Sequence, residues 1–174
     1  MNTTVSPFSE DTYSFPPLTL RSLQLSEAGL ISTTLAAMDP WKRLGFSASA
    51  LHCYLIGPDP ALNRFTVQDS QETVGVVCMR SPWLRGPYLE LLAVFPTAQG
   101  RKIGQTILYW IEKQALLTSN NIWAVTSEFN TRARRFYRAA NFVEIAPLKN
   151  LVANGYNEIL LRKVLEQTAP DDSN

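Results

Sequence analysis

Two periods of hydrophobicity divide the chain into strands and helices. Alternating or continuous apolar runs are typical of strands, and they occur at 18–24, 62–69, 72–80, 88–94, 122–128, 142–146 and 158–164. Apolar positions that repeat every three or four residues are typical of amphipathic helices, and they occur over 27–37, 47–56, 103–117 and 131–140. Because strands alternate with helices and paired strands stand at both ends, the sequence predicts an α/β (α+β) domain with a mixed sheet.

The segment 103–117 has the clearest helical pattern. Its predicted inner face consists of Gly104, Ile107, Leu108, Ile111 and Ala115. The inner face of the shorter helix at 131–140 is predicted to hold Ala133, Phe136, Tyr137 and Ala140. Ser26 and Ser47 precede the first two helices, and we expect them to act as caps because a serine oxygen can accept from the first free backbone N–H groups.

The ends of the chain differ from its middle. Residues 1–17 contain Ser, Thr and three prolines with little periodicity, so they are predicted to form a flexible arm. Residues 167–174 are predicted to form a disordered tail. No linker or repeat interrupts 18–166, which is therefore expected to fold as a single domain.

Composition and charge exclude several classes of protein. With 174 residues, 45% of them hydrophobic, the chain is not intrinsically disordered. A net charge of +1 does not favour a nucleic-acid partner. Two cysteines and one histidine argue against a zinc site, so no metal is expected. No apolar run reaches the ~20 residues of a membrane span, and the N-terminus does not resemble a secretory signal. A cytoplasmic protein with no membrane partner is expected.

A candidate anion site follows the strand at 88–94. The segment Phe95-Pro96-Thr97-Ala98-Gln99-Gly100-Arg101-Lys102-Ile103-Gly104 leads directly into a helix. Free backbone N–H groups and the helix dipole favour a pyrophosphate at such a position. Arg101 and Lys102 add formal positive charge. The segment is neither a Walker loop nor a GxGxxG motif, and an ordinary strand-to-helix turn is the alternative interpretation.

A second motif lies about 25 residues further on, and the two together indicate a family. The first is Gln99-Gly100-Arg101-Lys102-Ile103-Gly104 after Val94-Phe95-Pro96; the second consists of Asn130, Ala133, Phe136, Tyr137 and Asn141-Phe142. In this order, with a helix between them, they resemble the acyl-CoA and tyrosine motifs of the GNAT superfamily of N-acetyltransferases. The resemblance covers about 88–163. It implies a mixed central sheet of about six to seven strands flanked by about four helices.

The resemblance also implies how acetyl-CoA would bind. The backbone of Leu92 and Val94 would contact the acetyl and pantetheine groups. The pyrophosphate would bind the amides of Gln99, Gly100, Arg101, Lys102, Ile103, Gly104 and Gln105. Asn130 would contact the cofactor or the product amide, and Tyr137 would protonate the departing thiolate. Lys102 and Asn141 each replace a usual glycine; we expect binding to be retained because a helix start accommodates lysine, and asparagine tolerates the left-handed conformation.

The acceptor amine must lose a proton before it attacks. Glu90 is the first candidate base, since strand alternation predicts that it shares a face with Tyr88 and Leu92. Glu128 is the second candidate. In the 38–41 turn, Asp39 and Trp41 are candidates for recognition of the amine through charge and cation–π contact; a turn covered by a tryptophan is the alternative.

The predicted function is transfer of an acetyl group from acetyl-CoA to a primary amine, by direct attack in a ternary complex. The acceptor would be a small-molecule amine, a protein N-terminus or a lysine, and a homodimer is left open. A domain that binds acyl-CoA without turnover is one alternative. A nucleic-acid-binding module is another, because one short helix contains Arg132, Arg134, Arg135 and Arg138.

Overall fold

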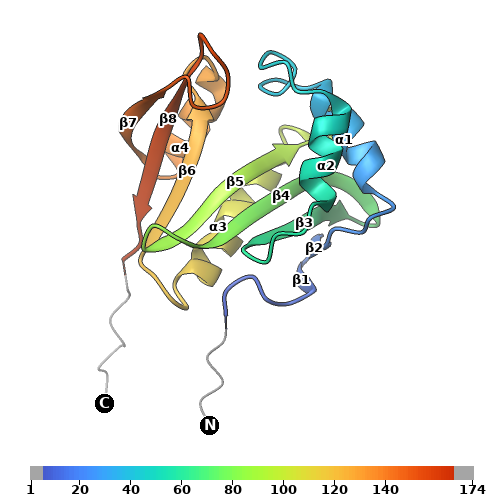
Figure 1. Cartoon of the computed structure of the whole chain (residues 1–174). Helices are drawn as coiled ribbons and strands as arrows, with labels where there is room; N and C mark the ends of the chain where they lie inside the picture. The colour runs from blue at the N-terminus through green and yellow to red at the C-terminus, as the bar shows by residue number, and fades with distance from the viewer. Residues whose placement is uncertain (1–5, 167–174) are drawn as a thin grey trace, which may run out of the picture.

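The computed structural model describes residues 6–166, which form one eight-stranded sheet with helices on both faces (Figure 1). In chain order the elements are β1 (Thr12–Phe15), β2 (Leu18–Ser22), α1 (Ala28–Ala36), α2 (Ala48–Ile56), β3 (Leu62–Asp69), β4 (Glu72–Trp83), β5 (Gly86–Val94), the 3₁₀ turn η1 (Pro96–Ala98), α3 (Ile103–Ala115), β6 (Asn121–Ser127), α4 (Thr131–Ala139), β7 (Val143–Lys149) and β8 (Asn157–Val164). Each strand and helix predicted from the sequence is present, with ends shifted by a few residues at most.

The sheet opens between two neighbouring strands. Its order is β1-β2-β3-β4-β5-β6-β8-β7, and every pair is antiparallel except β5 with β6. Register between these two strands covers Tyr88 with Trp123 and Leu89 with Ala124. Both strands continue beyond the last pair, and Figure 1 shows them diverging into a V. The divergence leaves an edge of β5 that β6 does not pair.

Two hydrophobic clusters fix the layers. One packs α3 and the buried face of α4 against one side of the sheet, and it includes Ile107, Ile111 and Tyr137. The other packs α1 and α2 against the opposite side through Ile31, Leu35, Leu51 and Leu55. The two helix pairs consequently lie on opposite faces and flank the V (Figure 1).

A bulge in β5 changes which residues share a face. Leu89 pairs with Met79 and Leu91 pairs with Cys78, so Glu90 has no partner across the ladder. Leu89 and Leu92 pack in the α3-side cluster, whereas Leu91 packs in the α1–α2 cluster. The prediction that Tyr88, Glu90 and Leu92 share one face was therefore wrong, because an extra residue in one strand reverses the alternation beyond it.

The predicted flexible arm is partly ordered. Thr12–Phe15 forms the edge strand β1 against β2. Phe8 is buried, and its ring contacts that of Trp110 with the centroids 5.3 Å apart. Aromatic packing onto α3 therefore holds residues that composition alone predicted to be loose. The remainder of the arm, 1–5, and the predicted tail at 167–174 lie outside the described residues.

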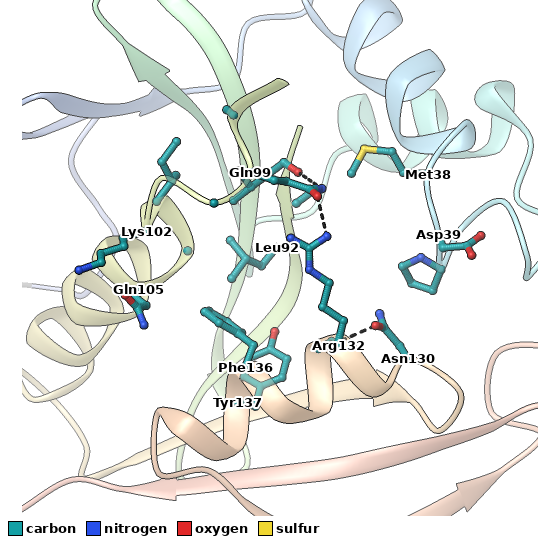
Figure 2. A pocket seen from close by; sticks show the side chains of 18 of the residues that line it. Met38, Asp39, Leu92, Gln99, Lys102, Gln105, Asn130, Arg132, Phe136 and Tyr137 are labelled. Atoms are coloured by element: carbon teal, nitrogen blue, oxygen red, sulfur yellow. Dashed lines mark hydrogen bonds between the residues drawn. The ribbon is translucent and has the colours of Figure 1, made fainter. Parts of the chain in front are cut away.

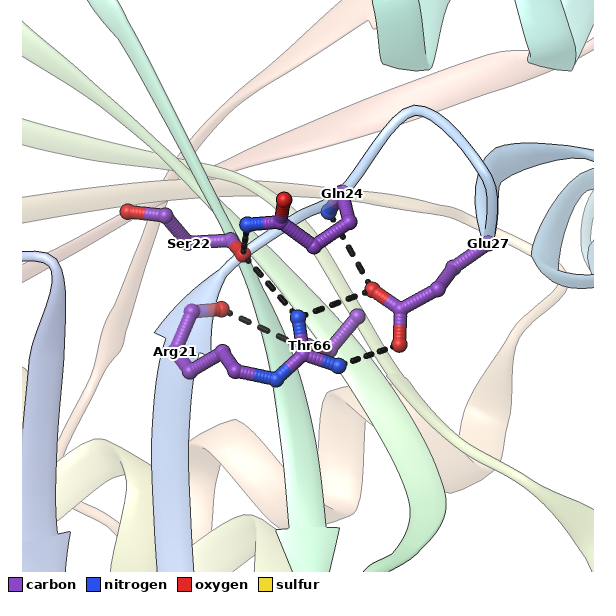
Figure 3. A network of polar contacts seen from close by, with 5 residues as sticks. All are labelled: Arg21, Ser22, Gln24, Glu27 and Thr66. Atoms are coloured by element: carbon purple, nitrogen blue, oxygen red, sulfur yellow. Dashed lines mark hydrogen bonds and ion pairs between the residues drawn. The ribbon is translucent and has the colours of Figure 1, made fainter.

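The start of α1 also differs from expectation. Ser26 does not cap the helix; Glu27 occupies the cap position. The Glu27 carboxylate accepts from the backbone N–H of Gln24 at 3.1 Å and pairs with Arg21 on β2. Figure 3 shows this network, in which Thr66 of β3 donates to the carbonyl of Arg21. It ties the first helix to the sheet. Ser47 does cap α2, accepting from Ala50.

Two further observations concern residues 6–166. None of their helices combines the length and the apolarity needed to cross a bilayer. Their His, Cys, Asp and Glu side chains form no group of three that could hold a metal ion.

Candidate active site

The turn from β5 into α3 exposes a run of backbone donors. Ala98 donates to Phe95, and the next backbone N–H with a protein acceptor belongs to Thr106, which donates to Lys102 at 3.1 Å. Across the described residues, no protein oxygen accepts from the seven amides between them, Gln99 to Gln105. Since α3 begins at Ile103, its positive dipole end lies among these amides. The combination is typical of an anion site.

Lys102 occupies the helix cap with a left-handed backbone, φ 61° and ψ 10°. The expectation that ordinary helical geometry accommodates lysine here was wrong. A left-handed conformation costs an L-residue roughly 1–2 kcal/mol, which explains why glycine suits this position. Gly100, two residues earlier, also has a positive φ of 83°, so two residues of this loop have a left-handed backbone before α3.

We therefore expect Lys102→Gly to stabilise the fold. Relief of the left-handed strain should raise the free energy of unfolding by about 1 kcal/mol, which thermal denaturation would register as a rise of roughly 2–4 °C. Lys113→Gly, a lysine replacement inside α3, should lower it by about 1 kcal/mol. A destabilised Lys102→Gly protein would contradict this account of the loop.

An arginine that was not expected at the site lines the first cavity together with Lys102. Arg101 does not line the cavity and instead forms an ion pair with Asp69 of β3. Arg132, on the first turn of α4, lines the cavity and donates to the Gln99 side chain at 2.6 Å. The side-chain nitrogen of Gln99, Nε2, in turn donates to the carbonyl of Val94 at 3.0 Å. Figure 2 shows Arg132 spanning the gap between α4 and this loop.

Close packing holds α4 against α3 at Gly104. A Cβ there would lie 3.1 Å from the Phe136 ring, closer than most side chains permit. The glycine therefore lets Phe136 approach α3, and the next residue, Tyr137, is carried into the cavity wall.

The first cavity has a volume of about 440 Å³ and lies between the two helices at the open side of β5. Tyr137 is 7% exposed, and its hydroxyl points into the cavity toward Leu92 (Figure 2). Burial, with a smaller contribution from Tyr88, raises the pKa of Tyr137 above its ordinary value. The phenol is therefore protonated at neutral pH and can act as a proton donor.

A second cavity, of about 370 Å³, adjoins the first on the α1–α2 side. The residues that line both are Pro40, Trp41, Leu92, Asn130, Ala133 and Tyr137. These residues come from both sides of the V, so the cavities meet where β5 and β6 separate. A ligand in one cavity can thus meet a ligand in the other beside the Tyr137 hydroxyl.

Glu90 lines the second cavity, but it is not a free carboxylate. Its Oε2 accepts from Arg80 Nε at 2.5 Å, and its Oε1 accepts from a second guanidinium nitrogen at 3.2 Å. Both oxygens are thus occupied, which weakens the case for Glu90 as a base. Glu128 lines neither cavity and accepts from Asn157 at 3.0 Å.

The remaining predicted residues are brought to the cavities in different ways. Asp39 and Trp41 both line the first cavity, although the Asp39 carboxylate points away from Tyr137 (Figure 2). Asn130 lines both cavities and also caps α4, because its side-chain oxygen accepts from Ala133 at 3.0 Å. Its cap role alone accounts for an asparagine at this position.

Two residues of the site were missed by sequence reasoning. Arg132 was counted only within the arginine-rich helix, two of whose other three arginines, Arg134 and Arg138, pair with Glu144. Glu158, at the start of a predicted strand, proves to line the second cavity. The presence of an acid in a strand paired with β6 was the available indication, but the sequence did not reveal which face it occupies.

A family model described as "Acetyltransferase (GNAT) family" matches residues 30–142. The chain belongs to the GNAT acetyltransferase family. The match contains the lining of the first cavity, whereas Val152 and Glu158 of the second cavity lie beyond its end. GNAT enzymes use acetyl-CoA, and acyl transfer is thus the class of activity of this protein. No curated protein sequence matches the chain.

Solved GNAT structures share the fold at low sequence identity. An acetyltransferase from Thermus thermophilus is 20% identical with a TM-score of 0.68, covering 85% of this chain and 97% of its own. The ribosomal-protein-S18-alanine N-acetyltransferase from Escherichia coli is 16% identical, with a TM-score of 0.67 and coverage of 88% and 97%. The spermidine N-acetyltransferase from Vibrio cholerae, solved with CoA and spermine, is 20% identical, with a TM-score of 0.63 and coverage of 86% and 96%.

Proposed function

We propose that this GNAT enzyme transfers an acetyl group from acetyl-CoA to a primary amine, by direct attack within a ternary complex. One observation carries the proposal: the loop with seven acceptor-free amides, Gln99 to Gln105, and the Tyr137 side chain line one cavity, Arg101 being the one loop residue outside the lining. The loop amides suit the diphosphate of the coenzyme. The Tyr137 hydroxyl suits its thioester end.

The chain's own groups have separable tasks in this scheme. The amides of Gln99 to Gln105 bind the diphosphate, with Arg132 nearby. The unpaired edge of β5 beyond Leu89 offers backbone groups to an extended pantetheine arm. Acetyl-CoA supplies an activated thioester carbonyl and a thiol leaving group. Tyr137 holds the proton that the departing sulfur needs, and its raised pKa keeps that proton in place until then.

Direct attack is favoured by the positions of the cysteines. Cys53 is exposed on α2, and Cys78 is buried with a pKa that burial raises to about 12. Neither lines either cavity. A thiol that is protonated or remote cannot accept the acetyl group, so a cysteinyl acyl-enzyme is disfavoured.

Thermal unfolding with acetyl-CoA, CoA, ADP and adenosine tests cofactor binding. A ligand at 100 times its Kd stabilises by about 2.7 kcal/mol, or roughly 5–10 °C for a chain of this size. We expect acetyl-CoA and CoA to give such shifts, ADP a smaller one, and adenosine none, because adenosine lacks the diphosphate. Equal shifts with adenosine and CoA would contradict a diphosphate site. Release of CoA thiol with a panel of amines then separates an enzyme from a domain that merely binds acyl-CoA.

A further inference from the structure

A buried carboxylate in the second cavity has no cationic partner. Glu158 of β8 is 3% exposed and lines the cavity together with Tyr137. Its one hydrogen bond is accepted from the Ser127 hydroxyl at 2.9 Å. Among residues 6–166, no lysine, arginine or histidine nitrogen lies within the 4.0 Å of an ion pair. The other acid of the lining, Glu90, has its charge balanced by Arg80.

Such a carboxylate is costly unless a ligand compensates it. Burying a charge without a partner destabilises a fold, and burial raises the pKa of Glu158 above its ordinary value. Glycine, alanine or an apolar residue at the same place would avoid this cost. An acid retained in a cavity wall, with its oxygens directed at no protein cation, is the arrangement expected of a binding site for a cationic ligand.

The groups around Glu158 leave one negative charge for that ligand. Tyr88 and Glu90 face the cavity from β5, Ser127 from β6, Tyr137 from α4 and Tyr54 from α2. The phenols are neutral because burial raises the pKa of each of them. Glu158 is accordingly the sole uncompensated charge among the described residues that line this cavity.

The rest of the lining is apolar and aromatic. From the α1–α2 side come Trp41, Leu44, Phe46 and Leu51. Val125 of β6 and Val152 of the β7–β8 loop lie on the other side. These surfaces suit a hydrocarbon or an aromatic ring, and the aromatic rings also favour a nearby cation. A polyamine carries several positive charges along its chain, and Glu158 could compensate one of them.

We propose that Glu158 binds the ammonium group of the acceptor and accepts its proton, and that the acceptor is a primary amine with a single positive charge and an apolar body. This inference rests on the proposed function, since it identifies the acceptor side of the same reaction. Glu158 thereby takes the place that the sequence assigned to Glu90.

Each bond change in this reaction is accompanied by a proton transfer. The ammonium group gives one proton to the Glu158 carboxylate, and the neutral amine attacks the thioester carbon, so that a C–N bond forms and the C–S bond breaks. Tyr137 gives its hydroxyl proton to the sulfur and regains one from the acetylated nitrogen. Glu158 then releases the remaining proton to solvent. One ammonium and one thioester yield one amide, one thiol and one proton.

Binding of 2-phenylethylamine to the CoA-saturated protein tests the site without turnover. By titration calorimetry, we expect Glu158→Gln to weaken binding at least tenfold, because the glutamine oxygen still accepts from Ser127 but carries no charge. Glu72→Gln, which removes an exposed strand carboxylate that lines neither cavity, should leave binding within twofold. Equal affinity in the wild type and Glu158→Gln, or no wild-type binding, would overturn the proposal.

Thiol release with acetyl-CoA distinguishes failure of the role of Glu158 from failure of the acetyltransferase proposal. We expect a kcat/KM at least 100-fold higher for 2-phenylethylamine than for spermidine, and a loss of about 100- to 10,000-fold in Glu158→Gln, with unchanged acetyl-CoA affinity. Turnover that survives in Glu158→Gln would overturn the role of Glu158 and leave the acetyltransferase proposal intact. Glu158-dependent amine binding without any acetylation would support the subsite and overturn the proposed function.

The pH dependence of thermal stability distinguishes a ligand-binding Glu158 from a carboxylate with a structural role. An acid whose pKa is raised on folding stabilises the protein below its unfolded pKa, and this stabilisation is lost as pH rises through the folded value. Glu158→Gln should therefore unfold at a higher temperature than the wild type at pH 8, and this advantage should shrink toward pH 4. A Glu158→Gln protein that is less stable than the wild type at pH 8 would indicate a structural carboxylate instead, and would overturn the proposal.

Discussion

Replacing Tyr137 by phenylalanine is expected to lower kcat by about 100- to 10,000-fold, the contribution typical of a positioned general acid. The ring would still fill its place between Phe136 and Phe142, whose centroids each lie 5.2 Å from that of Tyr137. Acetyl-CoA affinity and the midpoint of thermal unfolding should therefore remain close to those of the wild type. Steady-state thiol release, with the best amine of the panel, measures the loss.

Tyr109→Phe provides the matched control. Tyr109 lies on α3 and is 61% exposed, and it lines neither cavity. Removing its hydroxyl should leave kcat within twofold. If Tyr137→Phe retained the wild-type kcat, the sulfur would receive its proton from another source and Tyr137 would be a packing residue. If both kcat and acetyl-CoA affinity fell together, the hydroxyl would contribute to binding as well as to chemistry.

Replacing Gln105 by proline is expected to weaken acetyl-CoA binding by about 10- to 100-fold, since a hydrogen bond to a charged group contributes roughly 1.5–3 kcal/mol. Proline removes one N–H from the anion site. It is tolerated in the first turn of a helix, where that N–H has no acceptor within the helix. Gln105 is exposed, so the ring meets little of the core. Titration calorimetry with acetyl-CoA measures the change.

Gln105→Ala separates the backbone from the side chain. It retains the N–H and removes the amide group, so acetyl-CoA affinity should change by less than threefold. Circular dichroism would establish that α3 persists in both variants. Should the proline variant bind acetyl-CoA as tightly as the alanine variant, the Gln105 amide would not contact the coenzyme. Should alanine be as damaging as proline, the side chain would be the contact.

Local patterns in the sequence were sufficient for most of the fold. The helical repeat through Ile107 and Ile111 predicted α3 and its buried face, and the same face is buried in the structure. Asn141 adopts the left-handed φ of 65° that its place after α4 suggested. These features depend on neighbours a few residues apart, which the sequence displays directly. The two GNAT motifs then placed the β5–α3 loop and α4 beside each other.

Features that depend on distant partners were not predictable in the same way. The bulge at Glu90 exists because Met79 and Cys78 pair with residues on either side of it. The Arg101 side chain is held away from the first cavity because it pairs with Asp69, 32 residues earlier in the sequence. Glu158 enters the second cavity because β8 pairs with β6. In each case a side chain acquires its role from a strand or turn that is remote in sequence.

The structure of the complex with CoA tests the central claim most directly. We predict that oxygens of the diphosphate will lie about 2.7–3.2 Å from backbone nitrogens between Gln99 and Gln105, the range of a hydrogen bond, with the thiol beside the Tyr137 hydroxyl. A diphosphate bound elsewhere on the protein, or amides of this loop turned to protein acceptors while CoA is present, would contradict the account.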